Sequence, residues 1–303
     1  MRADKTHFSG LGKKDRRALV RELARLEREE AARRRRRRRI AWRAGLGVVG
    51  VAVLSVGTVT IVSALQPAPA LGPLNMASDG ILFSGNGKTV TAATTVALES
   101  KEAPETNPLD ASDGRLHLVA YVDYGSADSA AFETTNGSTL LSWVTSGNAT
   151  LELHPVALDD SVNQNYSTRA ANAVACVADA SPDSVPAINS ALAAAQPTAG
   201  ASGLTDAQLV ALVQKAGEND TSVAGCITSG RFGDWVADAT GRARASVPNS
   251  DVPTLTTAPL VLVNGKAYTG PLDDASAFES FAKSVYAPGA EAPAPTESTA
   301  PVG

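Results

Sequence analysis

The strongest constraint on what this chain can form is an uncharged stretch, Ala44 to Leu65, close to the N-terminus. A helix of this length rises far enough to cross the hydrocarbon core of a bilayer, which is about 30 Å thick. Seven consecutive arginines, Arg33 to Arg39, and then Arg43 lie directly before it. Because basic residues beside a span stay on the cytoplasmic side, we expect a single-pass cell-membrane protein with a cytoplasmic N-terminus and an extracytoplasmic C-terminal domain.

The charge distribution divides the chain at the same place. Residues 1–43 carry 17 Lys and Arg against six Asp and Glu, a net charge of +11, whereas residues 44–303 carry ten against 25, a net charge of −15. Two regions of opposite charge indicate two environments. The arginine run could also be a nucleic-acid patch, but its place beside the span explains it better. The acidic remainder speaks against nucleic acid as a partner.

A cleaved signal peptide is the alternative to a permanent anchor. The apolar region of a signal peptide is about 7–15 residues long, shorter than residues 44–65. Val62-Ser63-Ala64 and Ala68-Pro69-Ala70 nevertheless resemble small-residue cleavage sites. We favour the anchor because of the length of the apolar stretch.

One folded domain is expected between two Pro-rich segments. Residues 66–77 form a Pro-rich linker after the span, and residues 287–303 form a Pro/Ala-rich tail that we expect to be disordered. The folded domain then covers residues 78–286. Aromatic residues make up only 5% of the chain, so its core must be built largely from Ala, Val and Leu.

Hydrophobic patterning predicts a mixed α/β domain. The expected elements are a hairpin over residues 81–92, a buried strand over 115–123, a helix over 126–145, a strand over 150–156, a helical block over about 160–246 with Thr205 as an N-cap, a hairpin over 260–269 turning at Asn264-Gly265, and a closing helix over 274–286. The order β-α-β, helices, β-β-α predicts a thioredoxin-like fold with an inserted helical subdomain.

Several short motifs occur in an order that resembles one known family. They are Tyr121-Val122-Asp123-Tyr124 with Phe132-Glu133, Tyr166 to Ala173, Gly203-Leu204-Thr205-Asp206, Asp234-Trp235-Val236 and Ala258 to Gly265. Together they resemble the membrane-anchored DsbA-like disulfide oxidoreductases of bacteria. The resemblance implies the thioredoxin fold and a cis-proline at Pro259.

The chain departs from that family at its reactive motif. The family carries Cys-x-x-Cys between the Asp-Tyr and Phe-Glu motifs, and this chain has Ser126-Ala127-Asp128-Ser129 there. Disulfide exchange requires a thiolate that attacks and a second thiol that resolves the mixed disulfide. We therefore expect no redox catalysis at Ser126 and Ser129.

Ser126 has a structural and a catalytic interpretation. Serine is a favoured N-cap, and Asp128 in the first turn would suit the helix dipole. A serine hydrolase would need a base beside Ser126, and only His117 and His154 are available outside the cytoplasmic tail. Both histidines lie on predicted strands and no Gly-x-Ser-x-Gly motif is present, so we favour the N-cap.

The expected binding site is a peptide groove. The resemblance implies that Ala258, the residue before Pro259, presents its backbone beside Ser126, where an extended peptide could add as a strand. The groove residues would be Tyr124, Ser126, Ser129, Ala258 and Pro259. This predicts a redox-inactive peptide-binding or scaffold module. The alternatives are a residual or assisted role in extracytoplasmic protein folding, as in the oxidoreductase family, and a structural ectodomain that binds other membrane proteins through its span or acidic surface.

The only two cysteines, Cys176 and Cys226, lie in the helical block, outside the motif. In an oxidising compartment a pair predicts a structural disulfide. Two free buried thiols are the alternative. We expect no metal site, because two cysteines without a nearby histidine supply too few ligands. No nucleotide-binding motif is present, and we expect no cofactor.

Overall fold

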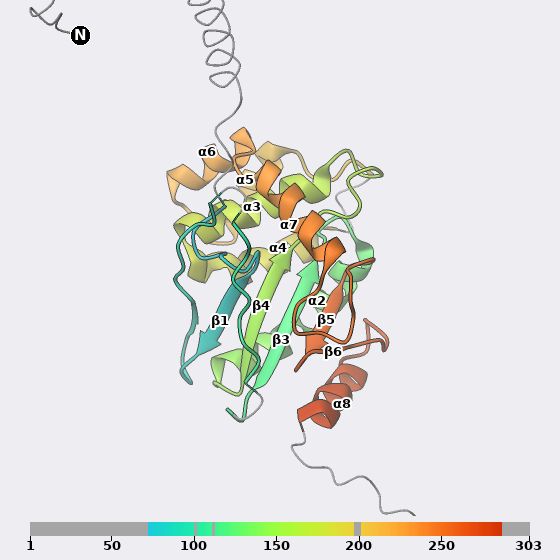
Figure 1. Cartoon of the computed structure of the whole chain (residues 1–303). Helices are drawn as coiled ribbons and strands as arrows, with labels where there is room; N and C mark the ends of the chain where they lie inside the picture. The colour runs from blue at the N-terminus through green and yellow to red at the C-terminus, as the bar shows by residue number, and fades with distance from the viewer. Residues whose placement is uncertain (1–71, 100–101, 111–112, 197–200, 287–303) are drawn as a thin grey trace, which may run out of the picture. The chain divides into compact units, whose positions relative to one another are not determined.

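The computed structural model describes residues 72–99, 102–110, 113–196 and 201–286, which form the folded domain (Figure 1). Within these ranges no helix combines the length and the apolar character that a membrane crossing needs. The predicted basic tail, the span at 44–65, most of the linker and the tail after residue 286 lie outside the described residues.

A six-stranded mixed sheet forms the centre of the domain, with the strand order β2-β1-β4-β3-β5-β6. Its strands are β1 (Ile81–Gly85), β2 (Val90–Ala92), β3 (Leu116–Val122), β4 (Ala149–Pro155), β5 (Leu260–Val263) and β6 (Lys266–Ala267). Only β3 and β4 pair in parallel, and all other neighbours are antiparallel. Parallel neighbours need a crossover, and helix α2 (Ala127–Thr145) supplies it.

Five α-helices and one short 3-10 helix follow β4 before the sheet resumes at β5. They are α3 (Tyr166–Ala180), η1 (Pro182–Ser184), α4 (Val185–Ala195), α5 (Asp206–Lys215), α6 (Thr221–Ser229) and α7 (Gly233–Ala245). Thr205 caps α5 in a full capping box with Gln208, as the sequence predicts. The closing helix is α8 (Ala275–Tyr286).

The turn between β5 and β6 confirms the hairpin predicted at Asn264-Gly265. Both residues have positive φ, +48° and +78° respectively. That backbone is the one for which hairpins favour Asn-Gly, because glycine has no Cβ to clash and asparagine tolerates the left-handed region.

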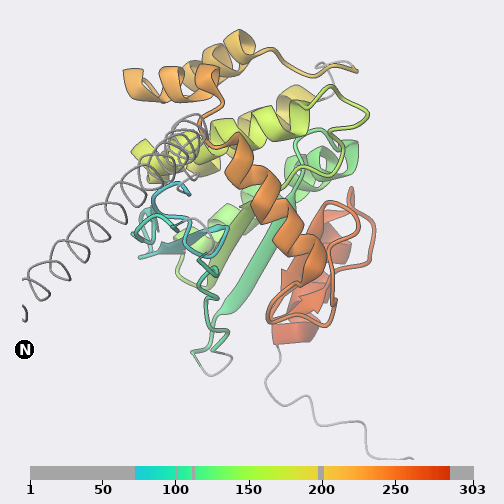
Figure 2. The ribbon, with the colours of Figure 1, turned by 45° about the horizontal axis from the view of Figure 1, so that its top comes forward.

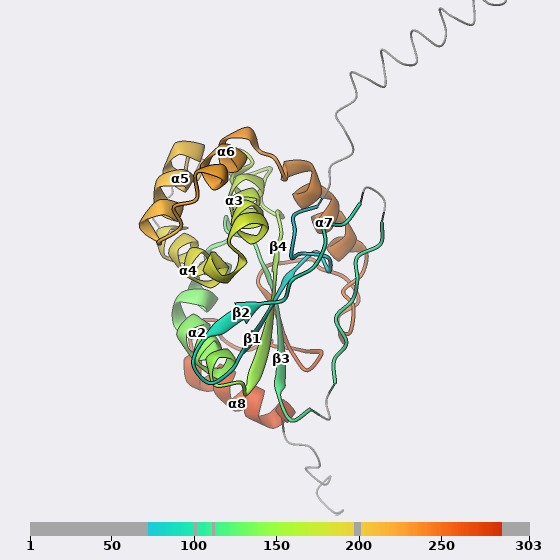
Figure 3. The ribbon, with the colours of Figure 1, turned by 90° about the vertical axis from the view of Figure 1, so that its left-hand side faces the viewer.

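The two faces of the sheet are covered differently, as the edge-on view in Figure 3 shows. Helices α2 and α4 lie on one side, where Phe132 of α2 packs edge-on against Phe278 of α8 with ring centroids 5.2 Å apart. On the other side lie α7 and the non-helical segment 102–110. The predicted fold class is confirmed in its coarse form, a mixed α/β thioredoxin-like domain.

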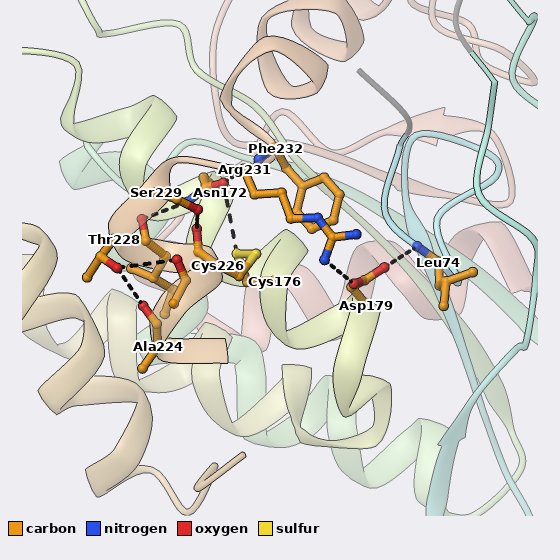
Figure 4. The surroundings of a disulfide bond; sticks show 12 residues. Leu74, Asn172, Cys176, Asp179, Ala224, Cys226, Thr228, Ser229, Arg231 and Phe232 are labelled. Atoms are coloured by element: carbon orange, nitrogen blue, oxygen red, sulfur yellow. Dashed lines mark hydrogen bonds and ion pairs between the residues drawn. A yellow bond between two sulfur atoms is a disulfide. The ribbon is translucent and has the colours of Figure 1, made fainter. Parts of the chain in front are cut away.

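A disulfide between Cys176 and Cys226 joins α3 to α6, which lie together at one end of the domain (Figures 2 and 4). Both residues are buried in a helical core rich in alanine. Beside the disulfide, the Asn172 side chain accepts a 2.8 Å hydrogen bond from the backbone N–H of Phe232. The crosslink predicted from the pair of cysteines is therefore present in the structure.

Candidate functional site

The Ser-x-x-Ser motif lies where β3 ends and α2 begins. Ser126 is the N-cap of α2, with an extended backbone, and its hydroxyl accepts a 3.3 Å hydrogen bond from the backbone N–H of Ser129. Asp128 lies in the first turn of the helix. A capping serine followed by an acidic residue satisfies a free backbone donor and suits the helix dipole, which confirms the structural interpretation of Ser126.

Ser126 also contacts the segment before β5, which is 132 residues away in sequence. Its hydroxyl donates a 3.0 Å hydrogen bond to the carbonyl oxygen of Ala258. The peptide bond between Ala258 and Pro259 is cis. Ser126, Ala258 and Pro259 are all partly exposed, so the structure brings these three predicted groove residues together at the surface.

Two other predicted groove residues point inward, which corrects the sequence interpretation of their side chains. Tyr124 is 2% exposed, and its hydroxyl donates to the side-chain oxygen of Asn189 in α4 at 2.9 Å. Ser129 is 3% exposed, and its hydroxyl accepts from the backbone N–H of Asp123 at 3.3 Å. Both side chains lie on the core-facing side of their segments, so they stabilise the motif from the interior of the protein.

A buried carboxylate that the sequence analysis did not assign to the site anchors the motif. Asp123 is fully buried, and its Oδ1 accepts from the Gly125 backbone N–H at 2.7 Å and from the Ser167 hydroxyl. Its Oδ2 accepts from the backbone N–H groups of Leu158 and Asp159 at 2.6 and 3.0 Å. Four donors saturate this carboxylate and tie together the ends of β3 and β4 and the start of α3. An aspartate directly after a buried strand was the signal that could have identified it.

Gly125, between Asp123 and the motif, is required by close packing. A Cβ at this position would lie 2.2 Å from the side-chain nitrogen of Asn163 and 2.6 Å from the Ser167 hydroxyl. The Gly125 carbonyl accepts a 3.1 Å hydrogen bond from the side chain of Gln196. The backbone that leads into the motif is therefore fixed from two sides.

The charges around the motif are negative. Burial, followed by the carboxylates of Asp123, Asp128 and Asp160, raises the pKa of Asp159 above its ordinary value. Burial also raises the pKa of Glu133, although a hydrogen bond from Ser190 acts in the opposite direction. The three carboxylates that act on Asp159 make its surroundings anionic.

Neither histidine supplies a base for Ser126. His117 lies in β3 and contacts the Thr150 hydroxyl at 3.1 Å, while His154 lies in β4 and contacts the Glu152 carboxylate at 3.1 Å. Both are buried. Among the described residues, the Ser126 hydroxyl is bonded only to backbone groups, which does not fit the nucleophile–base geometry of a serine hydrolase.

The comparisons with known proteins agree with this fold. The family model described as thioredoxin matches residues 110–283, more than half of the chain. No curated protein sequence matches the chain.

Several solved structures of thiol-disulfide oxidoreductases are similar to the chain. The reduced form of the disulfide bond oxidoreductase DsbG from Mycobacterium tuberculosis is 27% identical, with a TM-score of 0.49, over 67% of this chain and 86% of that chain. Reduced DsbA from the same organism is 26% identical, with a TM-score of 0.46, over 68% and 98%. The thiol-disulfide oxidoreductase MdbA from Corynebacterium diphtheriae is 13% identical, with a TM-score of 0.50, over 71% and 95%, a likeness of fold alone.

The family match spans β3, the serine motif, the helices that follow it, the cis-proline and most of α8. The chain belongs to the thioredoxin family.

Proposed function

We propose that the chain is a membrane-anchored, extracytoplasmic, DsbA-like thioredoxin domain that binds peptides or proteins without redox catalysis. Membership of the thioredoxin family supports the fold-level part of this proposal. The span at 44–65 and the arginine run before it support the anchor and its orientation.

One contact carries the binding part of the proposal, the hydrogen bond between Ser126 and the carbonyl of Ala258. It holds the start of α2 against the backbone that precedes the cis-proline. A carbonyl oxygen has two lone pairs, so Ala258 can still accept a hydrogen bond from a peptide that adds as an extended strand. Ser126 and Pro259 would then lie beside the Ala258 backbone to which the peptide binds.

The serine pair supports the absence of redox chemistry. A thioredoxin-type exchange needs thiols at both positions of the motif. Both cysteines of the chain are instead joined in the buried crosslink between α3 and α6.

Cysteines placed at both positions of the motif test whether the chain lacks only the redox chemistry or also the fold that would support it. We expect the native chain to be inactive in insulin reduction and in oxidation of a model dithiol, and the Ser126→Cys/Ser129→Cys variant to gain activity. The N-terminus of α2 should favour the thiolate form of the cysteine introduced at position 126. A matched control is Ser138→Cys/Ser142→Cys, which adds two thiols at exposed positions of the same helix and should stay inactive. Activity of the native chain would overturn the redox-inactive assignment.

Site-directed crosslinking tests the groove itself. A photoreactive amino acid at exposed Ala127, beside the motif, should capture extracytoplasmic peptides or proteins in cells that produce the full chain. The same group at exposed Lys283 in α8 is the control and should capture few of them. Equal yields at the two positions, or no adduct at Ala127, would contradict a peptide groove at Ser126 and Pro259.

A further inference from the structure

The backbone that precedes the cis-proline is available to a partner over three residues. Thr256 and Thr257 are exposed, and Ala258 is partly exposed. Within the described part of the chain, the backbone N–H groups of these three residues have no hydrogen-bond partner. Backbone that lacks a partner can pair with an added strand.

The two edge strands of the sheet are protected from such an addition. The backbone N–H of Ala92 in β2 donates to the carboxylate of Asp183 at 2.7 Å, and that of Ala267 in β6 donates to the carboxylate of Asp251 at 3.0 Å. Side chains therefore occupy donors that an added strand would need. This favours residues 256–258 over the sheet edges as the place where a peptide pairs.

The loop between β4 and α3, residues 156–165, lies on the other side of the serine motif. β4 and β5 are the two neighbours of β3, the first parallel to it and the second antiparallel (Figure 1). The loop after β4 and the segment before β5 therefore both lie at the end of β3 where the motif begins. Asp123 ties the loop to the motif, because its carboxylate accepts from the backbone N–H of Asp159 at 3.0 Å.

This loop holds an apolar side chain at the surface. Val162 is 75% exposed. Two residues further on, Gln164 and Asn165 have positive φ angles of +56° and +60°. The buried Asn163 fixes this backbone, since its side-chain oxygen accepts from the backbone N–H of Tyr166 at 2.9 Å. A strained loop that exposes a valine beside the motif indicates a contact surface.

Three aspartates near the motif carry charge that the protein does not balance. Asp128 lies in the first turn of α2, and Asp159 and Asp160 lie in the β4–α3 loop. None of the three forms an ion pair within the described residues, although Arg244 donates to the neighbouring Leu158 carbonyl at 3.5 Å. Other aspartates of the domain do pair with an arginine or a lysine, namely Asp79, Asp113, Asp179, Asp206 and Asp251. Unbalanced carboxylates favour a cationic partner.

We propose that the groove takes an extended peptide in which lysine or arginine side chains stand among small apolar residues, an inference that rests on the peptide binding proposed above. The peptide backbone would pair with residues 256–258. Its cations would lie near Asp128 and Asp159, and an apolar side chain would cover Val162. Burial and the neighbouring carboxylates raise the pKa of Asp159, and a peptide cation would offset that repulsion.

Two labelled heptapeptides test the charge preference. Both alternate Thr and Val, and two of their positions carry either Lys or Gln. Fluorescence anisotropy measures their binding to the purified 303-residue chain. Gln is the reference because residues 1–43 carry a net charge of +11 and would attract an acidic peptide. We expect the Lys peptide to bind about fivefold more tightly, and the difference to vanish in about 1 M salt.

The outcomes separate this inference from the peptide groove itself. If both peptides bind equally, the groove stands and the charge preference is refuted. If neither binds, the peptide groove fails and the charge preference fails with it.

Variants place the preference at the motif. Asp128→Asn/Asp159→Asn should abolish the fivefold advantage of the Lys peptide, whereas Asp273→Asn/Glu279→Gln, which removes the same number of charges around α8, should preserve it. Val162→Ser should weaken both peptides by about threefold and leave their ratio unchanged, because it removes apolar contact and no charge. Equal loss of the Lys advantage in the two double variants would show that the overall charge of the domain, and not this groove, selects the peptide.

Discussion

The crosslink between α3 and α6 and the motif between β3 and α2 use paired side chains in opposite ways. Cys176 and Cys226 are distant in sequence, buried, and bonded to each other. Ser126 and Ser129 are three residues apart and bond to nearby backbone and to Ala258. One pair stabilises the fold over a long loop, and the other organises a short surface segment. The comparison teaches that this chain uses its two cysteines for structure and carries hydroxyls, not thiols, where β3 leads into α2.

Removing the crosslink is the strongest test of that division. The variant Cys176→Ala/Cys226→Ala should lose about 4 kcal/mol of unfolding free energy, because the unfolded chain regains the entropy of a long closed loop. Urea denaturation of the two proteins measures the difference. The wild-type chain unfolded with a reductant present should reach the same lower value, which controls for loss of the buried side chains. A loss below about 1 kcal/mol would show that the crosslink contributes little to the fold.

Asp123 should stabilise the motif region, as the crosslink stabilises the helices. Asp123→Asn replaces an acceptor of four hydrogen bonds by a group that is part donor, and we expect a loss of about 3 kcal/mol in urea denaturation. Asp128→Asn removes the same charge at an exposed position and should change stability by less than about 0.5 kcal/mol. Similar effects of the two variants would mean that charge, and not the buried hydrogen bonds, matters at the motif.

The sequence predicted the elements well because each is determined by local signals. The strand at 115–123 with its apolar centre, the Thr205 cap and the Asn-Gly turn at 264–265 depend on neighbouring residues. The crosslink was predictable because a chain with two cysteines allows only one internal pairing.

What the sequence did not reveal depends on which way side chains point across long separations. Tyr124 belongs to a motif that resembles a known active site, yet its hydroxyl bonds to Asn189 in an inserted helix. Glu152 is a buried charged residue within β4, and its partners Ser78 and Asn107 come from distant segments. Its hydrogen bonds were therefore visible only in the folded structure.

The contribution of Ser126 should be smaller and local. Ser126→Ala removes an N-cap acceptor and the bond to Ala258, and we expect a loss of about 1 kcal/mol in urea denaturation. Ser138→Ala, at an exposed position inside the same helix, is the matched control and should be neutral or slightly stabilising, because alanine is the better helix former. An equal response of both variants would remove the capping role that distinguishes the motif from the rest of α2.

The smallest expected difference in stability between the motif and the crosslinked helices comes from charge. The folded-state pKa of Asp159, beside the motif, is raised by burial and by neighbouring carboxylates. The folded state therefore binds this proton more tightly than the unfolded state, so stability falls as pH rises from the unfolded pKa, about 3.9, through the folded pKa. Asp159→Asn should be slightly more stable than the wild type at pH 7, and the difference should close below about pH 3.9.

Salt distinguishes repulsion at Asp159 from a change in packing. Repulsion between partly exposed carboxylates is screened at high ionic strength, where the Debye length falls to about 3 Å at 1 M salt. The stability gained by Asp159→Asn at pH 7 should therefore shrink in about 1 M sodium chloride, as urea denaturation would measure. A gain that persists in salt would mean that removing a partly buried charge, or better packing of the new side chain, accounts for it, and not the repulsion between carboxylates. The anionic neighbourhood would then not be what sets the motif apart from the crosslinked helices.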